Sequence, residues 1–154
     1  MKKILSLMLV LSVLFAITGC AAKEAKPVLS CAEVAQKVKE SANFQELTEM
    51  TKAYIAKHLF VEEETLKDAC MLRDATMATP EFILIAEAAD EKKAGELKQA
   101  VQEYLDEMLP QYRDYQPEEM PKLESAKVLT KGSRVALIVS PDAAKTTAAL
   151  ESAW

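Results

Sequence analysis

EFILIAEA, at residues 81–88, is the stretch of this sequence that decides its fold. In an extended strand successive side chains point to opposite faces, so Phe82 and Leu84 lie on one face while Ile83 and Ile85 lie on the other. Apolar side chains on both faces are typical of a central strand that is covered on both sides. The stretch therefore predicts a sheet with this strand in its interior.

Three further segments carry strand patterns. Residues 68–74 precede the central strand across a break at Thr79-Pro80, although their apolar spacing also tolerates a helix. Residues 127–130 and 134–140 flank the turn sequence Lys131-Gly132-Ser133 and predict a hairpin. Two hairpin-like pairs of strands, separated by helical segments, predict an α+β fold with a mainly antiparallel sheet of about four strands.

Four to five helices are expected around this sheet. Their predicted starts are Ser30, Asn43, Asp90, Pro117 and Ser140. Ser30 and Glu33 have the spacing of a capping box, and the same logic at Asn43 predicts a helix that continues to His58. Pro110 is expected to end or kink the longest helix, because proline lacks an amide donor. Ser140-Pro141-Asp142 predicts a hydroxyl cap followed by a proline at the first helical position.

The first twenty residues resemble the signal of a bacterial lipoprotein. Lys2 and Lys3 form a basic start, residues 4–17 form an apolar run, and ITGC stands at residues 17–20. The apolar run is shorter than the ~20 residues that a membrane-spanning helix needs. We therefore expect signal peptidase II to cut before Cys20 and a diacylglyceryl group to anchor the chain there, with an ordinary secretory signal as the alternative.

The predicted organisation is a signal peptide at residues 1–19, a lipid-anchored linker at 20–29 and a single domain at 30–154. Without the signal the chain keeps 17 basic and 24 acidic side chains, a net charge of −7. Such an acidic domain is a poor candidate for binding nucleic acid. It also gives little reason to expect attraction to anionic lipid, so the anchor must supply membrane attachment by itself.

Two cysteines, Cys31 and Cys70, remain beyond the anchor. Outside the cytoplasm they can form a disulfide, and their spacing matches no metal motif. The interpretation that we prefer is two small buried residues.

No catalytic set is recognisable, and we expect no cofactor and no metal. His58 is the only histidine and has no serine or cysteine in a nucleophile motif, so we interpret it as a partly buried structural residue. Residues 62–64 are three glutamates without calcium-loop spacing, which favours a solvated turn. Glu118 and Glu119 follow Pro117, where acids complement the dipole of a helix start.

Three tyrosines, Tyr104, Tyr112 and Tyr115, gather around the end of the longest helix, with Arg113 between two of them. One interpretation is a groove that binds a peptide or a glycan. The alternative, which we prefer, is aromatic packing against the sheet. Trp154 is the last residue, and either docks on the domain or frays.

Several motifs of the chain occur together: the lipobox ITGC at residues 17–20, residues 81–85, the long charged helix, Tyr115-x-Pro117-Glu118, and Val128 followed by Gly132 and residues 135–139. With these motifs the chain resembles a bacterial lipoprotein family known as domain of unknown function 4358, over about residues 30–150. The resemblance implies an extracytoplasmic protein of Gram-positive bacteria. The family has no assigned activity, so the resemblance implies no catalytic residue.

The function that we expect is that of a lipid-anchored, non-enzymatic interaction domain on the extracytoplasmic face of the cell membrane. Its partner would be an envelope protein, a peptide or a cell-wall component. The alternative is a small envelope hydrolase that uses Asp or Glu side chains, which needs two carboxylates converging in a cleft. A solute-binding protein fits poorly, because 135 residues are few for two lobes that close on a ligand.

Overall fold

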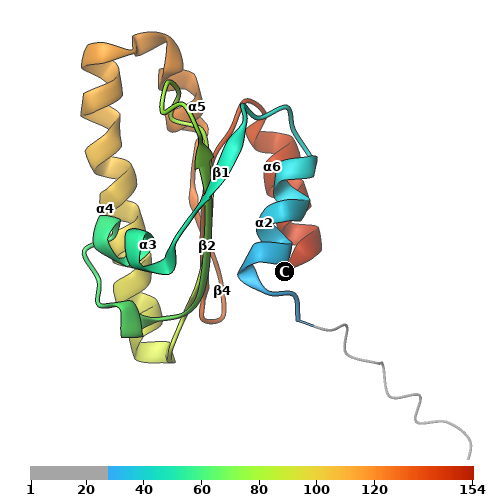
Figure 1. The fold of residues 1–154 in the computed structure, drawn as a ribbon, viewed down its shortest axis with the longest axis vertical. Coiled ribbons are helices and arrows are strands. Elements are labelled where there is room, and N and C mark those ends of the chain that lie inside the picture. Colours follow the sequence, from blue (N-terminus) through green and yellow to red (C-terminus); the bar gives the residue numbers. More distant parts are fainter. Residues whose placement is uncertain (1–27) are drawn as a thin grey trace, which may run out of the picture.

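The structure, a computed structural model, describes residues 28–154, in which five antiparallel strands form a single sheet with helices on both faces (Figure 1). The strands are β1 (Leu47–Met50), β2 (Leu66–Asp74), β3 (Phe82–Ala88), β4 (Val128–Lys131) and β5 (Arg134–Val139). Their order across the sheet is β1-β2-β3-β5-β4. The expected signal peptide, the lipid at Cys20 and most of the linker lie outside the described residues.

β3 is the central strand, as its sequence predicts. It pairs with β2 on one side and with β5 on the other, in registers that include Ile85 opposite Cys70 and Ile85 opposite Ala136. The side chains of residues 82–86 are at most 1% exposed, so both faces of the strand are covered. The predicted α+β fold with a mainly antiparallel sheet is therefore confirmed, as is the predicted β4–β5 hairpin.

Within residues 28–154, five helices cover the sheet in two layers. Helices α2 (Cys31–Glu40) and α6 (Ala143–Ala153) lie on one face, while α3 (Lys52–His58), α4 (Glu91–Tyr115) and α5 (Met120–Ser125) lie on the other (Figure 1). Two short 3-10 turns, η1 (Glu63–Thr65) and η2 (Pro117–Glu119), join these elements. Each face therefore has its own hydrophobic core.

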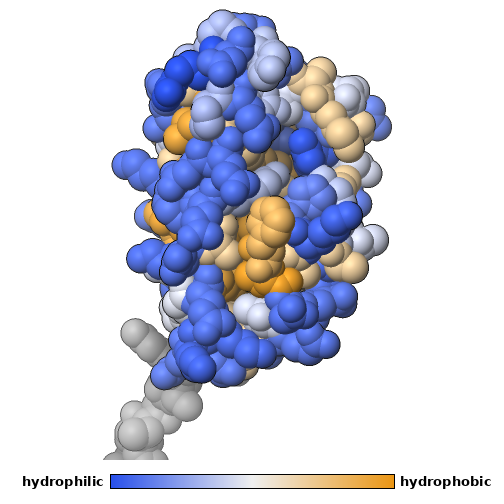
Figure 2. Space-filling view, turned by 90° about the vertical axis from the view of Figure 1, so that its left-hand side faces the viewer, coloured by the Kyte–Doolittle hydropathy of each residue, from blue (hydrophilic) through white to orange (hydrophobic). Residues whose placement is uncertain are grey.

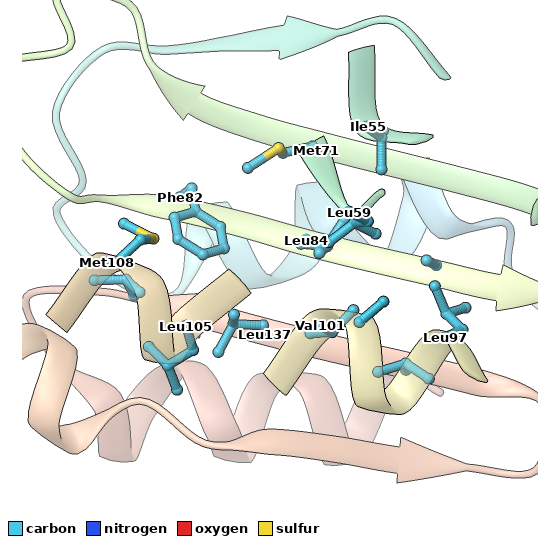
Figure 3. Packing of buried hydrophobic residues seen from close by; sticks show 14 of the residues in the cluster. Ile55, Leu59, Met71, Phe82, Leu84, Leu97, Val101, Leu105, Met108 and Leu137 are labelled. Atoms are coloured by element: carbon cyan, nitrogen blue, oxygen red, sulfur yellow. The ribbon is translucent and has the colours of Figure 1, made fainter. Parts of the chain in front are cut away.

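The core on the α4 face shows how the sheet and the longest helix fit together. Phe82 and Leu84 of β3 point toward α4, whose Val101 and Leu105 point back toward the sheet (Figure 3). Burial of each such side chain stabilises the fold by roughly 1.5–3 kcal/mol. Side chains of α4 from Ala94 to Tyr112 pack on this core, so the second half of the helix is held against the sheet.

The prediction of one helix from Asn43 to His58 is wrong, and the sheet has five strands rather than four. Residues 47–50 form β1, which pairs with residues 71–74 of β2. Thr51 then starts α3, because its side chain accepts a hydrogen bond from the amide of Tyr54 at 3.2 Å. The apolar spacing of this segment fits a helix, but pairing with a distant strand overrides that local preference.

Two helix boundaries also differ from expectation. Helix α4 continues past Pro110 to Tyr115, because Pro110 is exposed and water can satisfy the carbonyl that loses its amide partner. Helix α6 is capped by Asp142, which accepts from the amide of Lys145 at 3.1 Å. Ser140 is instead buried, with its hydroxyl 3.0 Å from that of Thr146. None of the helices formed by residues 28–154 combines the length and the apolar character needed to cross a bilayer.

Candidate functional site

A groove lies where the end of α3, the end of β2 and the second half of α4 meet; we call it the α3–α4 groove. Its volume is about 420 Å³. The residues that line it are Lys57, His58, Phe60, Arg73, Tyr104, Glu107, Met108, Gln111 and Tyr112. Figure 2 shows apolar surface in a hollow of the face that α3 and α4 form, with hydrophilic surface on either side. The lining of the groove therefore combines aromatic and thioether side chains with charged and amide groups.

Phe60 is the most unusual residue of this groove. It follows the end of α3 in a Schellman motif, in which its amide donates to the carbonyl of Lys57 and the amide of Val61 donates to that of Ala56. This position needs a positive φ and is usually occupied by glycine, yet Phe60 adopts it with φ 52°. The side chain is also 85% exposed. Both the backbone strain and the exposed ring disfavour phenylalanine here.

The floor of the groove is built by side chains of α3 and β2. Arg73 donates a hydrogen bond from Nη1 to the hydroxyl of Tyr54 at 2.7 Å. The ring of Tyr54 stacks on the ring of His58, with centroids 3.8 Å apart. His58 donates from Nδ1 to the carbonyl oxygen of Tyr54 at 2.9 Å, since that oxygen can only accept. His58 is half-buried and held by its own helix, so it lines the groove without a free Nδ1.

The structure brings two of the three predicted tyrosines into this groove. Tyr104 and Tyr112 lie two turns apart on α4 and both line it, whereas Tyr115 lies outside it and is 86% exposed. Burial raises the pKa of both Tyr104 and Tyr112, although the positive charge of Arg73 partly opposes this rise. The hydroxyls are thus protonated at neutral pH, and each can donate a hydrogen bond. Tyr104 also packs edge-on against Phe82, with ring centroids 5.7 Å apart, so the same side chain can pack on the sheet and line a binding groove.

Sequence reasoning missed Phe60 and Arg73. Phe60 lies between the predicted helix end at His58 and the glutamates at residues 62–64, and Arg73 lies on a predicted strand without a recognisable role. A large apolar residue directly after a helix, where glycine is expected, is the one local signal that could have drawn attention to Phe60.

Paired carboxylates occur away from this groove, in a buried ionic cluster beneath α5. Glu81, which is 1% exposed, accepts from Lys122 Nζ and from the amide of Gln45, both at 2.8 Å. Glu119 Oε2 lies 2.7 Å from the same ammonium group. Burial lowers the pKa of Lys122, but its bonds to Glu119 and Glu81 outweigh this effect and raise the pKa overall. The two carboxylates therefore converge on a single shared lysine, and neither lines the α3–α4 groove.

The other acidic residues singled out from sequence have simple environments. Glu118 is exposed in η2, and the three glutamates at 62–64 are exposed around η1, where Lys93 donates to the carbonyl of Glu64 at 3.1 Å. Among residues 28–154, no cluster of three or more His, Cys, Asp or Glu side chains is placed to hold a metal ion.

Cys31 and Cys70 are both free thiols in the core between the sheet and α2. Cys31 is 0% exposed and Cys70 is 2% exposed. Burial raises the pKa of Cys31 far above its usual range, and nearby Asp68 adds to this effect; burial also raises the pKa of Cys70 to about 11. Neither thiol is therefore a nucleophile at neutral pH.

Comparison with known proteins matches the chain to a family. No curated protein and no solved structure matches the chain. The model of a family described as "Domain of unknown function (DUF4358)" matches residues 40–140, which include all five strands and every residue of the α3–α4 groove. Because this match covers more than half of its residues, the chain belongs to the DUF4358 family.

Proposed function

We propose that this protein is a lipid-anchored, non-enzymatic binding domain on the extracytoplasmic face of the cell membrane, and that a polypeptide partner in the envelope occupies its α3–α4 groove. The lipobox that ends at Cys20 supports the anchor. Only seven residues separate Cys20 from Val28, where the described domain begins, and a chain of that length reaches at most about 30 Å. The partner is therefore a component found close to the membrane.

The observation that carries the binding role is the conformation and exposure of Phe60. A left-handed backbone costs an L-residue roughly 1–2 kcal/mol, and an exposed phenyl ring contributes little to the core. Strained residues that a fold retains cluster at ligand-binding sites. An exposed ring beside a groove is well suited to anchor a partner, because a partner that covers the ring gains the free energy of burying an aromatic side chain.

The rest of the groove has the chemistry of a protein-binding hot spot. Tyrosine and arginine are enriched where binding energy concentrates, and Tyr104, Tyr112 and Arg73 lie together here. The volume of about 420 Å³ suits one or two apolar side chains of a partner. Lys57 and Arg73 outnumber the single acid Glu107, which favours a partner that presents an acidic side chain next to its apolar anchor.

The two parts of the proposal need separate tests. Substitution of Cys20 by serine should abolish lipid labelling and release the protein from membranes or leave its precursor uncut. Lipid labelling that persisted in this variant would disprove the anchor.

For the groove, a photo-crosslinking amino acid at Gln111 places the probe on the exposed rim, and one at Ala148 of α6 is the matched control on the opposite face. In intact cells, the Gln111 probe should give a discrete crosslinked species that the Ala148 probe does not. Replacement of Phe60 by glycine should remove that species while the protein remains folded and anchored. Crosslinking that is unaffected by the Phe60 change, or enzymatic turnover by the purified protein, would contradict the proposed binding role.

A further inference from the structure

A second groove lies where the described chain begins and ends. Its volume is about 740 Å³, and the residues that matter for its chemistry are Val28, Leu29, Lys37, Lys131, Arg134 and Trp154. We call this surface the terminal face. It lies on the α2–α6 side of the sheet, where the C-terminus lies next to the start of α2 (Figure 1). The tether to Cys20 leaves the domain from this face.

The terminal face carries exposed apolar groups at its edge. The side chain of Val28 is 82% exposed, and Trp154 is half-buried at the end of α6, where its amide donates to the carbonyl of Leu150 at 3.2 Å. Trp154 is also the only tryptophan in the chain. Tryptophan is enriched at the boundary between lipid and water, because its ring is apolar and its N–H group needs a polar partner.

The charge of the terminal face differs in sign from that of the whole chain. Its lining contains three basic side chains and one acid, Glu87. Glu87 is neutralised by Arg134 Nε at 3.0 Å and by Lys67 Nζ, and Lys131 Nζ donates to the main-chain oxygen of Trp154. Lys37 is exposed and has no ion-pair partner among residues 28–154. The surface where the tether joins the domain is therefore locally basic, although the net charge of the mature chain is −7.

We propose that the terminal face docks on the surface of an anionic phospholipid bilayer, with Val28 and Trp154 at the interface and with Lys37 against the headgroups. This inference rests on the lipid anchor proposed above, because the anchor brings this end of the domain within about 30 Å of the bilayer. Anionic lipid attracts a basic residue near the surface, while the acidic remainder of the domain is repelled. The anchor thus supplies attachment, and the terminal face supplies orientation.

Docking has a consequence for the α3–α4 groove. The groove lies on the opposite side of the sheet from α2 and α6 (Figure 1). An oriented domain therefore keeps the groove clear of the lipid and presents it to a partner in the envelope. A domain that tumbles on its tether would present this groove only part of the time.

Trp154 provides a direct probe of docking. We suggest reconstituting the full-length lipidated protein in vesicles of brominated phosphatidylcholine, with and without brominated phosphatidylglycerol, and measuring the quenching of its tryptophan emission. The emission should be quenched and shifted to the blue in the anionic vesicles, and less so in the zwitterionic ones. Replacement of Lys37 by glutamine should lower the ratio of docked to undocked domain about fivefold, as expected for one basic residue near an anionic surface. Replacement of Arg113 by glutamine, an exposed position in the last turn of α4, is the matched control and should have no effect.

Flotation of the same vesicles separates failure of docking from failure of the anchor. Protein that floats with the vesicles while Trp154 stays unquenched would disprove docking and leave the anchor intact. Equal quenching in the two kinds of vesicle, or equal effects of the Lys37 and Arg113 changes, would disprove the electrostatic docking proposed here. Protein that does not float would refute the anchor, and the docking proposal would fall with it.

Discussion

Replacement of Phe60 by glycine separates what this residue contributes to binding from what it costs the fold. Glycine adopts the left-handed conformation at φ 52° without the steric cost of roughly 1–2 kcal/mol that a Cβ atom imposes. The added freedom of glycine in the unfolded chain offsets about 0.5–1 kcal/mol of this gain. Loss of the ring costs little, because the side chain is 85% exposed. We therefore expect Phe60→Gly to raise the free energy of unfolding by about 0.5–1 kcal/mol and Tm by a few degrees.

Phe60→Ala is the matched control, because it removes the same ring but keeps the Cβ atom and the backbone strain. Urea unfolding followed by circular dichroism should place it within about 0.5 kcal/mol of the natural protein. Both variants should lose the Gln111 crosslink equally. If glycine and alanine gave the same free energy of unfolding, or if glycine destabilised the protein, the strain argument would be refuted. If crosslinking survived in both, the ring would have no role in binding.

Three further outcomes follow from the ionisable groups. Lys122→Met leaves the buried Glu81 without its cation and should destabilise the protein by about 2–3 kcal/mol in urea unfolding, and a second change, Glu81→Gln, should restore part of this loss. Burial raises the pKa of Asp74, but hydrogen bonds from Thr76 and Thr79 outweigh burial and lower this pKa to about 2. The ionised Asp74 therefore stabilises the fold above its ordinary pKa of 3.8, and this stabilisation is lost as the pH falls toward 2. Asp74→Asn should flatten this part of the profile of unfolding free energy against pH. The two buried thiols, Cys31 and Cys70, should react with a thiol reagent only after unfolding, and fast labelling of the native protein would contradict their placement.

The interior of the sheet could be predicted because its signals are local. Residues 82–86 are apolar on both faces, and a strand of that composition is stable only when it is covered on both sides. Gly132 stands in the two-residue turn between β4 and β5 with φ 58°, which is the conformation that its predicted place in a hairpin requires. Such features depend on residues within a few positions of each other, so the sequence alone displays them.

The groove could be predicted only in part, for the same physical reason. Tyr104 and Tyr112 share one face of a helix, so their spacing along the chain brings them together. Phe60 lines the same groove, but the sequence around it does not predict this position. Residues 57–61 have the pattern of a helix end followed by a turn, and this pattern does not show which part of the domain lies beside them.

The position of α3 explains how Phe60 comes to line the groove. β1 pairs with residues 71–74 of β2, and this pairing leaves Thr51 at the edge of the sheet to start α3. Arg73, which lies in this paired part of β2, donates a hydrogen bond to the hydroxyl of Tyr54. The ring of Tyr54 stacks on that of His58, the last residue of α3. Phe60 is therefore placed by residues 71–74 of β2, which lie more than ten residues away in sequence. A helix through residues 43–58, which the local pattern favours, would remove both the edge strand and the groove, so the same non-local pairing that makes the prediction of β1 wrong creates the candidate site.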